Sequence, residues 1–242
     1  MKMTVEQPEA NVHVALTHLE LTTVHYDMND PQGLIWAYIT LIPLIIVVSV
    51  ATLVIFKRDL RTGSLLGGLL VSEAINYVLK KSIKEGRPTH IQQLRKKSYG
   101  MPSDHAQFMF FFALLVTMFM VKNKTKICKH IKRVLIVVLF TLALAVAYSR
   151  VHLGYHTDRQ VAYGSVIGMT LAMIWYGVTE YIFVPFIFPL LADSPIGRYF
   201  YLRDTTLIPN LMQFEYNNSL KEISRLKQQG SSSQSPNQQK KK

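Results

Sequence analysis

The chain has 242 residues, a net charge of +12 and 49% hydrophobic side chains, while only 17% of its residues are charged. The apolar residues gather in several long uncharged segments, which favours membrane-spanning helices over the buried helices of a large soluble protein. The basic residues lie between these segments, without the interleaved aromatic and basic side chains of a nucleic-acid-binding domain, so we assign them to membrane flanks that face anionic lipid.

Five apolar segments are predicted to cross a membrane as helices, because about 20 apolar residues span about 30 Å of hydrocarbon. The first, Ile35–Phe56, contains no charged side chain, although Pro43 lies inside it. The other four are Ser64–Leu79, Phe108–Val121, Val134–Tyr148 and Val161–Val178. A further stretch, Tyr181–Leu191, contains two prolines and is the tail of a kinked helix, an interfacial segment or a short sixth span. We therefore predict an all-α, polytopic membrane helical bundle.

Loop charges predict the orientation of these spans. The segment 122–133 holds six basic residues and no acid, and the turn after the first span is also basic. By the positive-inside rule both loops are cytosolic, and the acidic N-terminal segment 1–34 lies across the membrane. The loops 80–100 and 149–160 then share the non-cytosolic side. The loop 80–100 is itself strongly basic, which conflicts with the positive-inside rule for a non-cytosolic loop. The conflict is resolved if these charges bind a ligand.

The membrane domain is expected to cover residues 35–216. The remaining residues, 217–242, are polar, and from about Gly230 they are rich in Ser, Gln and Lys. This composition is typical of a largely disordered tail.

Three polar clusters stand at the ends of apolar helices on the non-cytosolic side. The first is Lys80 with Arg87, the second is Ser103-Asp104-His105, and the third comprises Arg150, His156 and Gln160. Hairpin connectivity brings these clusters to one membrane face. The topology therefore predicts a single site built from all three.

The side chains in this predicted site fit a phosphate group. Lys80, Arg87 and Arg150 are fixed positive donors for phosphate oxygens. Ser103 adds a hydroxyl donor, and the backbone N–H groups near Asp104 open a helix, whose N-terminus favours an anion. The alternative for each basic residue alone is a side chain that reaches the membrane interface without binding a ligand.

His105 and His156 are the candidate chemical pair. A phosphoryl group held by cations needs a nucleophile and an acid for its leaving oxygen. A neutral imidazole attacks when an acceptor holds its other N–H. Gln160 lies four residues beyond His156, so on a helix its carbonyl is a candidate acceptor. The other six histidines are expected to be structural: His13, His18, His25, His90, His130 and His152.

No metal site is expected. Cys128 is the only cysteine, which excludes a cysteine-rich metal site. Histidines without a nearby set of carboxylates are poor evidence for zinc.

Three motifs resemble the signature of the type 2 phosphatidic acid phosphatase superfamily. They are Lys80-x6-Arg87-Pro88, Pro102-Ser103-x-His105 and Ser149-Arg150-x5-His156. The resemblance implies a six-helix fold, no metal or cofactor, and a phosphohistidine intermediate on His156. It also implies that His105 protonates the leaving group and that Lys80, Arg87, Ser103 and Arg150 bind the phosphoryl oxygens.

Within this superfamily the sequence from about Leu21 to Tyr216 is most similar to the dolichyl-diphosphatase subgroup, including 99–103, 155–157 and the segment Arg203–Asn210. The resemblance implies hydrolysis of the lipid dolichyl pyrophosphate at the lumenal face of the endoplasmic reticulum membrane, in support of carrier-lipid recycling for protein N-glycosylation.

Two residues depart from the superfamily pattern. Asp104 stands where Gly is usual, and Gln160 stands where Asp is usual, although Gln resembles the dolichyl-diphosphatase subgroup. A carboxylate at 104 repels a bound pyrophosphate unless it pairs with a cation such as Lys80 or Arg87. Two alternative functions stay open: a phosphatase for phosphatidate or a sphingoid phosphate, and a catalytically silent membrane protein that binds lipid phosphates.

Glu73 is an ionisable residue inside a predicted span, which is costly and usually paired. It either packs through a hydrogen bond or supports the site near Lys80.

Overall fold

The structure, a computed structural model, describes residues 24–26, 29–88, 99–122, 129–208 and 210–233, apart from the side chains of residues 212 and 231–233. In chain order the helices are α1 (Gly33–Ile39), α2 (Ile42–Lys57), α3 (Leu60–Ile83), α5 (Asp104–Lys122), α6 (Lys129–His152), α7 (Asp158–Val178), the π-helix η1 (Thr179–Ile187), α8 (Phe188–Asp193), α9 (Pro195–Tyr199) and α10 (Leu211–Ser233). The β-structure of these described residues is limited to two isolated bridges. The all-α prediction is confirmed.

Five helical stretches of the described residues are long and apolar enough to cross a membrane: Gly33–Lys57, Leu60–Ile83, Asp104–Lys122, Lys129–His152 and Asp158–Asp193. Each contains one of the five predicted spans. The first is interrupted between Ile39 and Ile42, where α1 ends and α2 begins. Pro43 is in the first turn of α2, a position that tolerates its missing N–H.

The predicted sixth segment is the end of the fifth helix. Helices α7, η1 and α8 run on from one another over 36 residues, Asp158–Asp193. Pro185 lies inside η1, where the wider π-helical turn accommodates a residue that cannot donate a backbone hydrogen bond. Of the three alternatives for Tyr181–Leu191, the structure therefore has the tail of a kinked helix.

Helix α5 is the centre of the bundle and packs against α3, α6 and α7. Its buried apolar side chains include Phe108, Met109, Phe111 and Leu115, which form the core with residues of α6 and α7. Helix α7 approaches α5 closely through Gly164 and Gly168. A Cβ at Gly164 would lie 2.5 Å from the carbonyl oxygen of Ser103, and one at Gly168 would collide with the carbonyl of Gln107. The missing side chains therefore bring α7 against the start of α5, where the predicted site lies.

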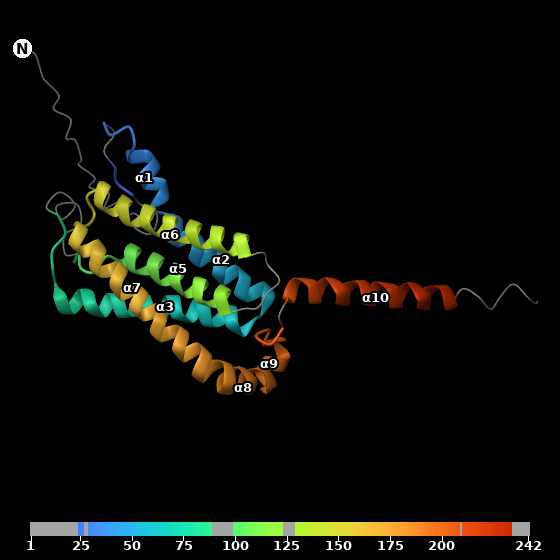
Figure 1. Cartoon of the computed structure of the whole chain (residues 1–242). Coiled ribbons are helices and arrows are strands. Elements are labelled where there is room, and N and C mark those ends of the chain that lie inside the picture. The colour runs from blue at the N-terminus through green and yellow to red at the C-terminus, as the bar shows by residue number, and fades with distance from the viewer. Residues whose placement is uncertain (1–23, 27–28, 89–98, 123–128, 209, 234–242) are drawn as a thin grey trace, which may run out of the picture.

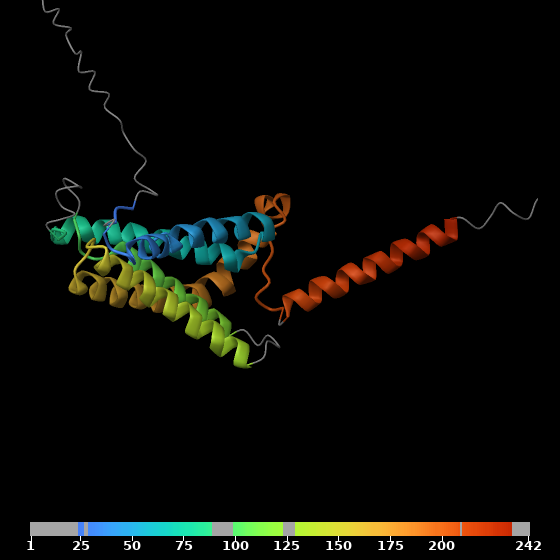
Figure 2. The same cartoon turned by 90° about the horizontal axis from the view of Figure 1, so that it is seen from above.

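The helix ends divide the bundle into two faces. Figure 1 shows the end of α3, the start of α5, the end of α6 and the start of α7 together at the left, and the view in Figure 2 agrees. The α2–α3 turn, α8, α9 and the start of α10 lie at the opposite end. The three predicted polar clusters belong to the first of these ends.

The segment Arg203–Asn210 lies at the other end, although it belongs to the resemblance to the dolichyl-diphosphatase subgroup. The backbone of Arg203 donates to the carbonyl of Arg58 at 3.0 Å and accepts from Leu60 at 3.1 Å. The Asp59 carboxylate caps α3 and accepts from Thr205 Oγ1 at 2.5 Å. These contacts fix the α2–α3 turn, far from the predicted site.

A buried charge also ties the helices together at that end. The Glu180 carboxylate, at the start of η1, pairs with Arg61 of α3 and Lys122 of α5. Beside it, the hydroxyls of Ser64 and Thr179 are 2.9 Å apart and hydrogen-bonded. A buried carboxylate needs such partners, so the cluster fixes the positions of α3, α5 and η1.

Helical structure extends beyond residue 217, where we predict a largely disordered tail. Helix α10 covers Leu211–Ser233 and projects away from the bundle in both views, while 234–242 lie outside the described residues. Apolar side chains recur at helical spacing at Leu220, Ile223 and Leu226, among good helix formers.

Candidate active site

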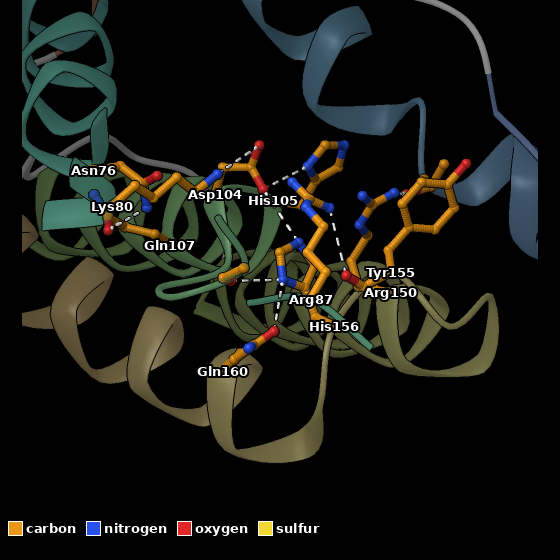
Figure 3. Close-up of polar contacts among 12 residues, drawn as sticks. Asn76, Lys80, Arg87, Asp104, His105, Gln107, Arg150, Tyr155, His156 and Gln160 are labelled. Carbon is orange, nitrogen blue, oxygen red and sulfur yellow. Dashed lines mark hydrogen bonds and ion pairs between the residues drawn. The ribbon is translucent and has the colours of Figure 1, made fainter. Parts of the chain in front are cut away.

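The structure brings all eight predicted site residues to one end of the bundle. The last turn of α3 carries Lys80, the first turn of α5 carries Asp104 and His105, the last turn of α6 carries Arg150, and the first turn of α7 carries Gln160. Arg87, Ser103 and His156 come from the connecting segments. Figure 3 labels all of these residues except Ser103.

His156 is buried, with 1% of its surface exposed. Its Nδ1 lies 2.8 Å from the carbonyl oxygen of Gly100, so Nδ1 carries the proton and donates to this acceptor. The other ring nitrogen, Nε2, then has a lone pair. Burial lowers the pKa of His156 from 6.5 to about 4, an effect that the Asp104 carboxylate partly opposes. The imidazole is therefore neutral at physiological pH and able to attack through Nε2.

The Asp104 carboxylate faces Nε2 of His156 (Figure 3). Its Oδ2 lies 3.4 Å from Lys80 Nζ, and its Oδ1 lies 3.3 Å from His105 Nδ1. The same Oδ1 is 3.6 Å from His156 Nε2. Lys80 is one of the two cations that the sequence offered as a partner for this carboxylate, and it forms the ion pair. One anionic group thus lies between an ammonium and two imidazoles.

Tyr155 contacts two buried arginines, Arg87 and Arg150. The guanidinium of Arg150 lies 4.0 Å over the Tyr155 ring and donates to Thr40 Oγ1 at 2.9 Å. Arg87 Nη1 donates to the Tyr155 carbonyl at 3.4 Å. The Tyr155 hydroxyl in turn accepts from the backbone N–H of His25 at 2.7 Å. Tyr155 therefore positions both cations, a role that its sequence pattern does not reveal.

Ser103 lies directly before α5 and is completely buried. Its backbone N–H donates to the carbonyl of Gln160 at 3.1 Å. Its Oγ has no hydrogen-bond partner among the described residues. A buried hydroxyl in this position is suited to donate to a ligand oxygen.

The Gln160 side chain joins the segment that follows α3 to the segment that precedes α7. Its Nε2 donates to Glu85 Oε1 at 3.0 Å and to the Gly86 carbonyl at 2.8 Å. Its Oε1 accepts from the N–H of Thr157 and lies 3.3 Å from His156 Nδ1. The predicted contact with His156 is therefore present, but it is longer than the contact of His156 with Gly100. Sequence spacing did not identify Glu85 or Gly100, because both act across loops distant in sequence.

A buried amide network lies below the site. Gln107 of α5 donates to the Ser72 carbonyl at 2.7 Å and accepts from Asn76 Nδ2 at 2.8 Å, which fixes α3 against α5. Glu73 is half-buried, and its carboxylate interacts electrostatically with Lys80 and Asp104. The interaction with Lys80 is consistent with the alternative in which Glu73 supports the site.

The remaining predictions concern metals and the other histidines. Within the described ranges, no group of three or more His, Cys, Asp or Glu side chains is arranged to hold a metal ion. His152 contacts Asp30 at 2.6 Å, beside Trp36 and Tyr148. Three of the other histidines, His13, His18 and His90, lie outside the described residues, as does Cys128.

Comparison with protein families gives a match over residues 61–183 to the PAP2 superfamily. All eight predicted site residues lie inside this range. Among solved structures, the chain resembles the transmembrane PAP2-type phosphatidylglycerolphosphate phosphatase from Bacillus subtilis, with a TM-score of 0.54 and 23% identity. That match covers 64% of this chain and 80% of the bacterial one, and it supports the fold.

Three curated relatives match most of the chain. Dolichyldiphosphatase 1 of Dictyostelium discoideum is 56% identical over 216 residues, which cover 89% of this chain and 94% of the relative. Dolichyldiphosphatase 1 of Homo sapiens is 40% identical over 84% of this chain and 86% of its own length. Lipid phosphate phosphatase gamma of Arabidopsis thaliana is 36% identical over 84% of this chain and 91% of its own length.

Proposed function

The chain belongs to the PAP2 superfamily, and on this premise we propose that it is a dolichyldiphosphatase. It hydrolyses dolichyl pyrophosphate to dolichyl phosphate and inorganic phosphate in a membrane. The names of its relatives in Dictyostelium discoideum and Homo sapiens support this substrate. The proposed catalytic domain is 35–216, with His156 as nucleophile and His105 as general acid.

The observation that carries the proposal is the position of the Asp104 carboxylate. It lies within 3.6 Å of Lys80 Nζ, His105 Nδ1 and His156 Nε2, where an anion is stabilised. We propose that oxygens of the terminal phosphoryl group take over these contacts when substrate binds. Arg87, Arg150 and the open Ser103 hydroxyl are the further proposed donors to that group.

In the first step the lone pair on His156 Nε2 attacks the terminal phosphorus. The bond from this phosphorus to the bridging oxygen breaks, and dolichyl phosphate leaves with a proton from His105. The imidazole becomes a phosphorylated cation whose Nδ1–H stays on the Gly100 carbonyl, 2.8 Å away in the free protein. The basic side chains stabilise the charge that spreads over the phosphoryl oxygens.

In the second step a water molecule attacks the phosphohistidine. His105, now neutral, accepts a proton from this water, and the bond between phosphorus and His156 Nε2 breaks. Inorganic phosphate leaves, and both histidines return to their starting states. The same residue thus acts as acid and then as base, which requires that His105 reach both the leaving oxygen and the water.

The chemistry of the leaving group favours a pyrophosphate over a phosphate monoester. A pyrophosphate releases a phosphate oxygen, which is already stable as an anion near neutral pH, whereas a monoester releases an alkoxide. The alkoxide depends far more on protonation by His105. A site with one imidazole as its acid is therefore better matched to the pyrophosphate.

We further propose that the reaction needs no metal ion and takes place at the lumenal face of the endoplasmic reticulum membrane. Lys80, Arg87 and Arg150 supply the positive charge that a metal supplies in other phosphatases. The opposite end of the bundle contains the basic turn Lys57–Arg61, which favours the cytosolic side. Released dolichyl phosphate is then available as carrier lipid for protein N-glycosylation.

Purified protein tests this proposal when it is offered dolichyl pyrophosphate, phosphatidate and a sphingoid phosphate, each with and without a metal chelator. We expect phosphate release that is fastest from dolichyl pyrophosphate and unchanged by the chelator. Preference for phosphatidate or the sphingoid phosphate would make the chain a phosphatase for another lipid. No release from any of the three by folded protein would favour the silent lipid-binding alternative.

A further inference from the structure

Glu85 lies just beyond α3 and contacts two side chains of α7. Its Oε1 accepts from Gln160 Nε2 at 3.0 Å, and its Oε2 accepts from Arg159 Nη2 at 2.8 Å. Its own backbone carbonyl accepts from the N–H of Gly100 at 2.7 Å. Glu85 thus lies against Gln160 on one side and against the residue that holds His156 on the other.

The orientation of the Gln160 amide follows from its surroundings. Nε2 faces two acceptors, the Glu85 carboxylate and the Gly86 carbonyl, so the amino group must be on that side. Oε1 then faces the N–H of Thr157 and Nδ1 of His156, at 3.3 Å each. The amide therefore joins the carboxylate to the imidazole, and the carboxylate polarises the amide so that Oε1 becomes more negative.

The charge of Glu85 is maintained at neutral pH. The hydrogen bond from Gln160 holds the pKa of Glu85 below its ordinary value, with a further contribution from Arg159. The Arg159 side chain is 68% exposed, against 28% for that of Glu85. An exposed ion pair of this kind contributes little to the stability of the folded protein. The hydrogen bond to the buried Gln160 is therefore the interaction through which Glu85 affects His156.

We propose that Glu85 is a positioning residue for His156, because it provides through Gln160 the negative charge that stabilises the imidazolium formed during phosphoryl transfer. Where the superfamily pattern has Asp at position 160, a carboxylate is in direct reach of the histidine. In this chain the carboxylate is one amide farther away. This inference rests on the proposed function, since it assigns a role in that reaction.

The test compares four variants of the full-length protein with dolichyl pyrophosphate as substrate. Glu85→Gln removes the charge but keeps an acceptor for Gln160. Arg159→Gln removes the exposed ion pair alone and is the matched control. Gln160→Asp in the Glu85→Gln background restores a carboxylate close to Nδ1 of His156, and Gln160→Asp alone completes the cycle.

We expect Glu85→Gln to lower kcat about 10-fold with KM changed less than about twofold, because the lost charge acts on the transition state. Arg159→Gln should stay within about twofold of the unaltered protein. The double variant should recover most of the lost kcat, a rescue that a purely structural role for Glu85 does not produce. Full activity of Glu85→Gln, equal losses in Glu85→Gln and Arg159→Gln, or no rescue in a folded double variant would each overturn the inference.

A second measurement separates this inference from the proposed function. In ¹⁵N-histidine NMR titrations of the substrate-free protein, Glu85→Gln should lower the pKa of His156 further, because the imidazolium loses a stabilising charge, and Arg159→Gln should leave it unchanged. An unchanged His156 pKa in Glu85→Gln would contradict the inference. The titration needs no turnover, so inactivity towards lipids would overturn the proposed function alone.

Discussion

The N–H at Nδ1 of His156 donates to the backbone carbonyl of Gly100 across 2.8 Å. A neutral backbone carbonyl thus sets the tautomer of the proposed nucleophile. A carboxylate in the same position would set the tautomer and would also raise the basicity of the imidazole. The carbonyl is fixed in turn, because the N–H of Gly100 donates to the carbonyl of Glu85 at 2.7 Å. The nucleophile therefore depends on the path of the backbone at Gly100.

Gly100→Ala should remove this support. A Cβ at residue 100 would lie 2.7 Å from Gln160 Oε1 and 2.9 Å from the Gly86 carbonyl, so the loop must shift. We expect a loss of about 1–3 kcal/mol in the free energy of unfolding and a kcat at least about 10-fold lower. Thermal unfolding and phosphate release measure the two effects.

Gly63→Ala is the matched control, since an added Cβ at Gly63 meets nothing within 4 Å. In the helix α3 this change should be neutral or stabilising by up to about 1 kcal/mol, with normal turnover. If Gly100→Ala turned over as fast as Gly63→Ala, the Gly100 carbonyl would not be the group that orients His156.

The protonation of His156 should depend on pH in an unusual range. Burial favours the neutral imidazole and lowers its pKa to about 4, so protonation of Nε2, which blocks attack, requires a pH far below 6.5. A ¹⁵N-histidine NMR titration should therefore find His156 still neutral at about pH 5.5. Loss of its signal in His156→Gln identifies the resonance, and a midpoint near 6.5 would contradict the description of a desolvated nucleophile.

Removal of the Asp104 carboxylate should favour anion binding. In the free protein this group contacts Lys80, His105 and His156, which are the proposed contacts of the phosphoryl group. Asp104→Gly and Asp104→Asn should therefore keep or raise kcat/KM and tighten inhibition by inorganic phosphate about 3-fold or more, as expected from the loss of a competing charge. Steady-state kinetics with added phosphate measures both quantities.

The two Asp104 variants separate the effect of charge from that of volume. Asp104→Asn removes the charge and keeps most of the side-chain volume, whereas Asp104→Gly removes both. Complete loss of activity in both, with folding intact, would mean that Asp104 has acquired a catalytic role.

The sequence predicted the spans and the convergence of the three polar clusters at one end of the bundle, for a simple physical reason. Long uncharged segments require membrane helices, and charges at the ends of hairpin-connected helices must meet at one face. Lys80, Arg87, Arg150 and both histidines lie together at one end of the bundle (Figure 3), and Ser103 directly precedes α5 at the same end. Asp104 was expected to need a cation such as Lys80 or Arg87, because an uncompensated carboxylate beside a phosphate site is costly, and Lys80 lies beside it.

The parts that the sequence did not predict depend on contacts across loops. The Gly100 carbonyl is a backbone group, so no residue type marks it as the acceptor for His156. Glu85 reaches Gln160 from a segment 75 positions away. The end of the fifth span was left open because Pro185 could either break the helix or be absorbed in a π-helical turn. Helix α10 was missed since its polar composition outweighed its apolar spacing.

The orientation of the site can be tested with N-glycosylation acceptors. Ala15→Asn creates the acceptor Asn-Leu-Thr in the N-terminal segment, and the native acceptor Asn217-Asn218-Ser219 lies on α10. With five spans and a lumenal N-terminus, the acceptor that Ala15→Asn introduces should be modified and Asn217 should not. A shift in electrophoretic mobility that an endoglycosidase reverses is the measurement.

The native acceptor Asn123, in the predicted cytosolic loop and outside the described residues, should also stay unmodified. Modification of Asn217 together with an unmodified acceptor in Ala15→Asn would invert the orientation and place the site in the cytosol.

The central claim is that His156 becomes phosphorylated during turnover. The most direct measurement uses dolichyl pyrophosphate with a radioactive terminal phosphate, mixed with the protein and quenched within one turnover. We predict a label on the protein that is stable to alkali and labile to acid, maps to the peptide with His156 and disappears in His156→Ala, which should also be inactive. A label on another residue, or full turnover by His156→Ala, would contradict this account.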